Sequence, residues 1–164
     1  MSDVEKIESP EVAHYDKKQS QELARLAELY SEADKRDDND PLMLQEKMTF
    51  YGMIYEIMGD MEALATGQEK LAYAYRQEVS ARKFIHTKQI EENGTMRKLT
   101  GEERKAVAEL AVRKYRRNEA RFAEESKKWK NRRESVLEQI NIMKRRQDLF
   151  ADQWNKANAL NGYS

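Results

Sequence analysis

The stretch from Thr100 to about Asn158 constrains the fold of this chain more than any other. It contains no proline, and no glycine lies between Gly101 and Gly162. Its apolar side chains recur at steps that are sums of three and four residues, at Val107, Ala111, Tyr115, Phe122, Trp129, Val136, Ile140, Met143, Phe150 and Trp154. This spacing predicts one stripe along a single α-helix. A helix of roughly 57 residues spans roughly 85 Å, so its stripe must be buried against other helices.

A second long helix is predicted from Pro41 to about Glu92. Asp40 supplies an acidic N-cap, and proline is favoured at the first helical position. The apolar residues of this segment again alternate steps of three and four. Glycines at positions 52, 59 and 67 each cost about 1 kcal/mol relative to alanine. They are expected to mark bends, or places where another backbone approaches closely.

Two sequence motifs lie between the long helices and indicate how they are connected. Asn93-Gly94-Thr95 favours a turn, because Asn and Gly tolerate a left-handed backbone. Thr100-Gly101-Glu102-Glu103 matches a capping box, which begins the next helix. Two long helices joined by a short turn are expected to fold back on each other.

The predicted fold is therefore all-α. It is a long antiparallel helical hairpin of residues 41–92 and 101–158, with a shorter N-terminal helix over residues 20–36, coiled-coil-like and oligomeric. Residues 19–158 are expected to form a single helical domain. A loose, acidic N-terminus over residues 1–18 precedes it, and a tail over residues 159–164 follows it.

The net charge of zero conceals an asymmetry. Residues 1–93 carry 20 acidic and 12 basic side chains, a balance of −8, whereas residues 94–164 carry 18 basic and 10 acidic, a balance of +8. Such an asymmetry between halves indicates an anionic partner. It equally fits an acidic half that neutralises the basic half within the fold or across subunits, so both interpretations stay open.

Residues typical of catalysis or metal binding are sparse. The chain has no cysteine, and its two histidines, His14 and His86, lack a ligand partner at helical spacing. The acidic segment 34–40 resembles a calcium-binding loop but lacks the required glycine and distal glutamate. We expect a solvated loop there, no metal, no cofactor, no small-molecule substrate and no enzymatic activity. Residues 1–11 do not fit a signal peptide and no run is apolar enough to span a membrane, so a cytoplasmic protein is expected.

Basic side chains gather on the third predicted helix and form what we call the basic strip. Its candidate nucleic-acid contacts are Arg113, Arg116, Arg117, Arg121, Lys127, Lys128, Arg145 and Arg146. Most of them point away from the apolar stripe at 100° per residue. Such a strip can follow a phosphate backbone, with affinity from counterion release. It can equally serve only to keep a long helix soluble.

Two aromatic residues of the second helix lie among basic ones. Tyr73 and Phe84 are close in sequence to Arg76, Arg82 and Lys83. Aromatic faces beside cations stack on bases. Packing against a neighbouring helix is the preferred interpretation for both rings.

The apolar stripe also suggests self-association. The candidate residues for it are Phe122, Trp129, Val136, Ile140, Phe150 and Trp154. Trp129, Phe150 and Trp154 are expected to extend past the region that the short first helix can cover, and an uncovered stripe indicates another subunit. Polar residues within the stripe can fix register and oligomeric state or can lie where the helix meets solvent; they are Asn118, Ser126, Arg133 and Gln147.

In order and pattern the chain resembles small helical proteins of tailed phages, in particular the UvsY-type recombination mediators. The resemblance covers roughly residues 20–155. It lies in the early helix with Leu29-Tyr30, the long central helix, the turn, the capped start at Thr100, and a final helix whose matching residues are Trp129, Ile140, Lys144 and Arg146. It implies a homo-oligomer that binds single-stranded DNA and helps load a recombinase, with a recombinase or single-strand-binding protein as partner.

Two functions are therefore considered. The first is a non-enzymatic, self-associating protein that binds single-stranded DNA as a recombination mediator. The second is a protein-binding module without affinity for nucleic acid, such as an inhibitor of a host enzyme or defence system, or an assembly scaffold. In the second case a phosphate-like acidic surface is expected to face a DNA-binding target; its residues are 34–40 with Glu46, Glu56, Asp60 and Glu62.

Overall fold

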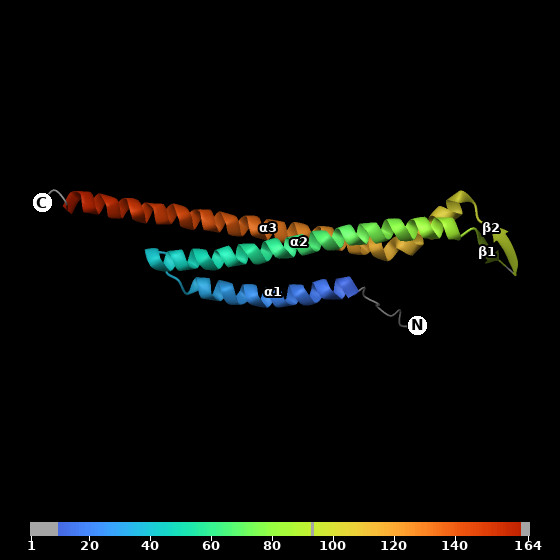
Figure 1. Cartoon of the computed structure of the whole chain (residues 1–164), viewed down its shortest axis with the longest axis horizontal. Coiled ribbons are helices and arrows are strands. Elements are labelled where there is room, and N and C mark those ends of the chain that lie inside the picture. The colour runs from blue at the N-terminus through green and yellow to red at the C-terminus, as the bar shows by residue number, and fades with distance from the viewer. Residues whose placement is uncertain (1–9, 93, 162–164) are drawn as a thin grey trace. The chain divides into compact units, whose positions relative to one another are not determined.

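The computed structural model describes residues 10–92 and 94–161 (Figure 1). Within this part of the chain there are three α-helices and one two-stranded sheet. The helices are α1 (Pro10–Asp34), α2 (Pro41–His86) and α3 (Gly101–Asn161), and the strands are β1 (Gln89–Glu92) and β2 (Thr95–Lys98). Helices α2 and α3 pack against each other as a long pair. The predicted all-α class is confirmed.

The first helix is longer than predicted. Helix α1 begins at Pro10 rather than at about residue 20. The prediction of a loose segment over residues 1–18 is therefore wrong for the residues from Pro10 onward. Residues 1–9 lie outside the described part of the chain. Val12 and Tyr15 are buried, at 5% and 0% exposure. In the sequence these two apolar positions stand among polar residues such as His14 and Lys17, so they were not recognised as part of a helical stripe.

The second helix is shorter than predicted. Helix α2 ends at His86 and does not reach Glu92. Instead, β1 pairs antiparallel with β2 in the register Glu92 to Thr95 and Gln89 to Lys98. Gly94 adopts a φ of +74°, which glycine reaches without steric cost. The Asn-Gly dipeptide between two four-residue segments is a signal for a β-hairpin, whereas the sequence interpretation used it only as a helix–helix turn.

The described residues divide into two compact units. Unit 1 contains those up to Glu62 and those from Lys127 onward, and unit 2 contains Ala63–Ser126. Unit 1 thus holds α1, the first part of α2 and the last part of α3. Unit 2 holds the rest of both long helices and the β-hairpin.

The core of unit 1 is built by all three helices. Leu44, Ile54 and Met61 are fully buried on α2. Trp129 on α3, which is 1% exposed, donates a hydrogen bond from Nε1 to the Tyr15 hydroxyl on α1 at 3.0 Å. The first helix therefore covers Trp129, contrary to the expectation that the stripe is uncovered there.

The core of unit 2 is narrower, because only α2 and α3 contribute helices to it. Its buried apolar positions are mostly small, and they are Ala65, Ala72, Ala108, Val112 and Phe122. Alanine at facing positions lets two helix backbones approach closely. We call the contact surface between α2 and α3 the seam. In unit 2 no third helix covers the seam, so side chains at its edges stay accessible to solvent.

Polar residues of the apolar stripe are paired across the seam. In unit 2 the hydroxyls of Ser126 and Thr66 are 2.8 Å apart. In unit 1 Nη1 of Arg133 lies 3.2 Å from Oε2 of Glu62. The interpretation that these positions fix helix register is favoured for both residues, while Asn118 and Gln147 are half-buried.

The glycines of α2 do not mark a close backbone approach. A Cβ at Gly59 would lie 3.4 Å from Nη1 of the Arg133 side chain. Gly52 and Gly67 have nothing within 4 Å of the same position. Of these three glycines, Gly59 therefore lies beside a side chain of α3, and a methyl group there would make ordinary van der Waals contact with Arg133.

Both predicted helix starts are confirmed. The Asp40 carboxylate accepts hydrogen bonds from the backbone N–H groups of Leu42 at 2.8 Å and Met43 at 3.1 Å. At the start of α3 the Thr100 N–H donates to the Glu103 carboxylate at 2.8 Å, and the Glu103 N–H donates to the Thr100 hydroxyl at 3.3 Å. These reciprocal bonds are those of a capping box.

Replacing Tyr15 with phenylalanine should destabilise the protein. The change keeps the ring and removes the hydroxyl that accepts from Trp129, which leaves a buried indole N–H without this partner. The free energy of unfolding in urea should fall by about 1–3 kcal/mol. Tyr73→Phe is the control, because Tyr73 is half exposed and its loss of a hydroxyl should change stability by less than about 0.5 kcal/mol. Equal effects of the two changes would contradict the assignment.

The Glu103 carboxyl should titrate far below the usual range. Two bonds from the Arg97 guanidinium, at 2.8 and 3.1 Å, and the Thr100 bonds lower the pKa of Glu103 from 4.5 to about 2. Since the folded pKa lies below the ordinary one, the contribution of this carboxylate to stability is present above about pH 4.5 and is lost as the pH falls towards 2. NMR titration of the Glu103 side chain measures the pKa directly. Arg97→Ala should raise it, and Lys98→Ala should leave it unchanged.

Candidate nucleic-acid interface

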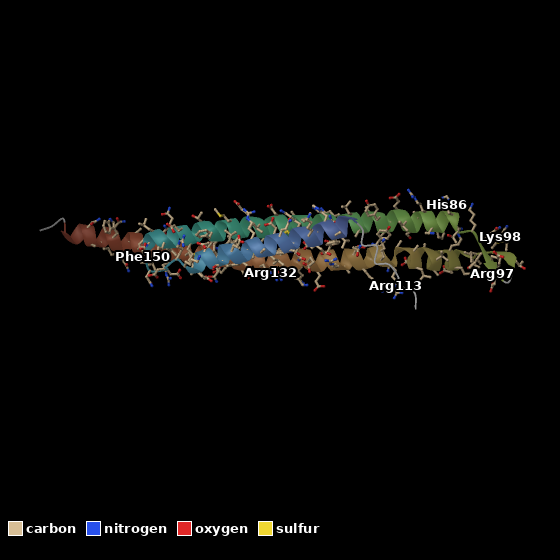
Figure 2. All side chains as sticks on the ribbon, turned by 90° about the horizontal axis from the view of Figure 1, so that it is seen from below. His86, Arg97, Lys98, Arg113, Arg132 and Phe150 are labelled. Carbon is tan, nitrogen blue, oxygen red and sulfur yellow. The ribbon has the colours of Figure 1, made fainter. Side chains whose placement is uncertain are left out.

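Unit 2 carries an excess of positive charge. Residues 63–126 contain 14 basic and 10 acidic side chains, a net charge of +4. Figure 2 shows His86 at the end of α2, Arg97 and Lys98 on β2, and Arg113 on the side of α3 that faces away from α2. The question is which of these cations are available to a ligand.

Two of the four strip residues in unit 2 are free of acidic partners. Arg113 and Arg117 are exposed, lie four residues apart on one face of α3, and form no ion pair within the described residues. Arg116 is exposed but is held by Glu109 at 2.6 Å. Arg121 is half-buried, with its guanidinium 5.4 Å from the centre of the Phe122 ring.

The other four strip residues lie in unit 1. Lys127, Lys128 and Arg145 are exposed. Arg146 is also exposed but pairs with the Asp38 carboxylate at 3.1 Å. The structure thus divides the predicted strip equally between the two units.

The interpretation that Tyr73 and Phe84 pack against a neighbouring helix fits only one of the two rings. Tyr73 is 50% exposed, and the Arg76 guanidinium lies 5.1 Å from its ring centre. Phe84 is half-buried and lies under the Arg104 guanidinium at 4.3 Å, while Arg104 Nε donates to the Phe84 carbonyl at 2.9 Å. Packing therefore accounts for Phe84, whereas the Tyr73 ring is accessible.

A second aromatic pair was missed at the sequence level. Tyr75 on α2 and Tyr115 on α3 have ring centres 6.0 Å apart, and Tyr75 is 41% exposed. The Lys114 ammonium lies 5.5 Å from the centre of the Tyr115 ring. Both tyrosines fall on apolar stripes, so the spacing assigned them to the core. Their exposure follows from the two-helix packing of unit 2, which no local pattern reveals.

The two unpaired arginines of α3 lie on a different side of this helix from its Tyr115 ring. At 100° per residue, Arg113 and Arg117 point nearly opposite to Tyr115, and Lys114 lies about a quarter-turn from it. A ligand that uses all of them must pass around the helix. An extended polyanion with flexible, stackable groups meets this requirement better than a compact anion.

Arg76, which contacts the Tyr73 ring, also forms an ion pair with Glu119 across the seam. Its Nε lies 2.8 Å from the Glu119 carboxylate on α3. Both side chains are mostly buried, at 22% and 26% exposure. This pair therefore orients the guanidinium over the Tyr73 ring.

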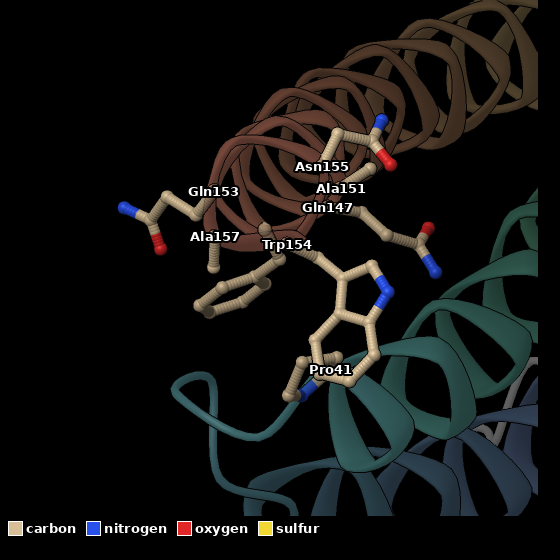
Figure 3. A pocket seen from close by; sticks show the side chains of 8 residues that line it. Pro41, Gln147, Ala151, Gln153, Trp154, Asn155 and Ala157 are labelled. Carbon is tan, nitrogen blue, oxygen red and sulfur yellow. The ribbon is translucent and has the colours of Figure 1, made fainter. Parts of the chain in front are cut away.

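A hollow of about 620 Å³ lies in unit 1, where α3 runs beside the start of α2. Its lining residues are Pro41, Gln147, Phe150, Ala151, Gln153, Trp154, Asn155 and Ala157. Figure 3 shows the Trp154 ring projecting from α3 toward Pro41. Trp154 is 70% exposed, and none of the described residues that line the hollow is charged.

The six residues proposed for self-association separate into two groups. Phe122, Trp129 and Val136 are buried within the chain itself, at 1%, 1% and 4% exposure. Their burial inside the chain removes the reason for placing them in a subunit contact. Ile140 and Phe150 are half-buried, and Trp154 is exposed. Phe150 and Trp154 line the hollow, so apolar surface remains accessible there for contact with another subunit.

The acidic segment 34–40 is largely engaged by the chain itself. Asp38 binds Lys47 at 2.7 Å as well as Arg146, and Asp37 accepts from the Asn39 N–H at 2.9 Å. Of the further acidic candidates, Glu46 pairs with Arg36 at 2.6 Å and Glu62 with Arg133. Within the described residues no group of three or more His, Asp or Glu side chains is arranged to hold a metal ion.

None of the helices within residues 10–92 and 94–161 combines the length and apolar character needed to cross a membrane.

No protein-family model matches the sequence, and neither the curated proteins nor the solved structures include a match. The function is therefore argued from the residues of this chain.

Proposed function

We propose that the chain is a non-enzymatic, self-associating helical protein that binds single-stranded DNA through unit 2. The observation that carries the proposal is the pair Arg113 and Arg117, exposed on one face of α3 without an ion pair in the described part of the chain. Basic side chains that have no acidic partner can release the counterions of a phosphate backbone when they bind it.

Accessible aromatic rings favour a single strand over a duplex. Tyr73 and Tyr75 are 50% and 41% exposed on α2, and each is accompanied by a cation or a second ring. Bases of a single strand can stack on such rings, at about 1–3 kcal/mol per base. Paired bases of a duplex are not available for this contact.

The salt dependence of binding tests the phosphate contacts. The double variant Arg113→Gln/Arg117→Gln removes two of them, so the log–log salt slope should become flatter by about 1.4. Helicity should be kept, since glutamine is a good helix former. The measurement is fluorescence anisotropy of a labelled oligonucleotide between about 50 and 300 mM salt, the range in which such contacts lose affinity.

The matched control is Arg82→Gln/Lys105→Gln. It removes the same charge from unit 2 at cations that already pair with Glu78 and Glu102. The control should alter the slope much less. No binding by the unmodified protein at the lowest salt would remove the nucleic-acid proposal, and equal slopes in the two double variants would remove the assignment to Arg113 and Arg117.

The hollow around Trp154 supports self-association. Trp154 stands out from α3 next to the small side chains of Ala151 and Ala157, so the same surface offers a protruding ring and space to receive one. A two-fold symmetric contact joins the same surface of two copies, so the ring of one copy would enter the hollow of the other. The described residues of its lining are uncharged, which lowers the cost of removing water from both copies.

Trp154→Ala should weaken assembly without lowering helicity. The residue adds little to the stability of a single chain, because 70% of its surface is exposed. Light scattering over a dilution series should show a larger species for the unmodified protein above about 10 μM, a concentration at which a micromolar contact is populated. Leu149→Ala is the control, since Leu149 is 61% exposed and does not line the hollow. A steep fall in melting temperature with unchanged size would place Trp154 in the core of the chain instead.

A protein partner in place of nucleic acid is the second candidate, and the uncharged hollow favours it. The acidic surface considered for it is weakened by the internal ion pairs of Asp38, Glu46 and Glu62. This candidate would be selected if the chain bound another protein and showed no affinity for DNA. Recombinase loading, which the resemblance to UvsY-type mediators implies, stays a prediction.

A further inference from the structure

A groove in unit 1 is lined by all three helices and belongs neither to the basic strip nor to the hollow at Trp154. Its volume is about 710 Å³, within the range of sites for small molecules. Leu26, Met58 and Val136 line it and are each 4% exposed. These side chains give the groove an apolar floor contributed by α1, α2 and α3 in turn.

Polar groups meet at the rim of this groove. Tyr30 from α1 and Tyr51 from α2 line it, with ring centres 5.9 Å apart and ring planes perpendicular. Arg132 from α3 also lines it. Three hydrogen-bonding side chains from three helices thus face one apolar surface, an arrangement typical of a site that orients a ligand.

Arg132 is exposed, contacts one aromatic ring and keeps its charge available. Its guanidinium lies 5.2 Å from the ring centre of Trp129, which is itself buried and bonded to Tyr15. Within the described residues Arg132 forms no ion pair. Burial, together with nearby Tyr51, raises the pKa of Tyr30 against the opposing effect of Arg132, so the Tyr30 phenol is a neutral donor at physiological pH.

We propose that this groove binds a small amphipathic anion, a monocarboxylate carried on a short apolar body. The carboxylate lies at Arg132 and the tyrosine hydroxyls, and the body covers Leu26, Met58 and Val136. One guanidinium with two neutral hydroxyls matches a single negative charge. A phosphate dianion would need more than one cation to compensate its desolvation. This departs from the expectation that the chain binds no small molecule.

The probe is 4-phenylbutyrate, and its neutral analogue 4-phenylbutyramide has nearly the same shape. The chain has two tryptophans, so the full-length Trp154→Phe variant leaves Trp129, which carries Arg132 on its ring, as the only tryptophan reporter. We expect a saturable change of its emission with the acid. The amide should bind about tenfold more weakly, because a hydrogen bond to a charged group is lost.

Arg132→Gln should reduce the affinity for the acid to that for the amide. Lys130→Gln, which removes an exposed cation outside the groove, should change nothing. Tyr51→Phe should weaken binding of the acid several-fold through loss of one hydroxyl contact. Far-UV circular dichroism checks that each variant folds, and Arg132→Lys, which keeps the charge, should retain part of the affinity.

No saturable change up to about 10 mM, an affinity too weak for a built site, would overturn the proposal. Equal binding of acid and amide would overturn it as well, and this comparison needs no variant of Arg132. The measurement contains no nucleic acid, and Arg113→Gln/Arg117→Gln should bind the probe normally. Failure of the groove proposal and failure of the DNA proposal are therefore separate results.

Discussion

The antiparallel contact between α2 and α3 is the constraint on which the rest of the structure depends. Helices of 46 and 61 residues offer many sliding registers with similar apolar contact, so hydrophobic burial alone does not choose among them. Directed polar contacts do: the Ser126–Thr66 bond in unit 2, and the Arg133–Glu62 pair in unit 1. A shift by one helical turn would bury these groups without partners, which costs more than the pairs themselves contribute.

The presence or absence of α1 explains why the two units expose such different surfaces. In unit 1 helix α1 supplies Tyr15 to Trp129 and closes an aromatic core, and α1 also forms one wall of the groove at Tyr30. Unit 2 does not contain α1. A helix pair has two open edges, so Tyr75 and Tyr115 meet there as a partly exposed pair although their spacing is that of core residues. The same periodicity therefore leads to a buried core in one unit and an accessible edge in the other.

This difference marks what the sequence could predict. Helix class, the Asp40 and Thr100 caps and the antiparallel pairing follow from local spacing and capping chemistry, and they were predicted. The coverage of Trp129 was not, because it depends on Tyr15, a residue 114 positions away. The β-hairpin at Gly94 was missed for a different reason: its Asn-Gly signal was present, but it fitted a helix–helix turn equally well. For the basic strip, the spacing located the cations but could not show that Arg116 and Arg146 are held by Glu109 and Asp38.

The pairing pattern also resolves how a chain of zero net charge can present free cations. An acidic group on a neighbouring helix neutralises those arginines that face the seam, as Glu119 does for Arg76. Acidic residues on the same face of α3 neutralise others, as Glu109 does for Arg116. Arg113 and Arg117 escape both, because they point away from α2 and form no ion pair within the described residues. Overall neutrality therefore does not exclude available cations. Whether the charge of an arginine is available depends on the direction in which it points relative to the seam and on the acidic residues of its own helix face.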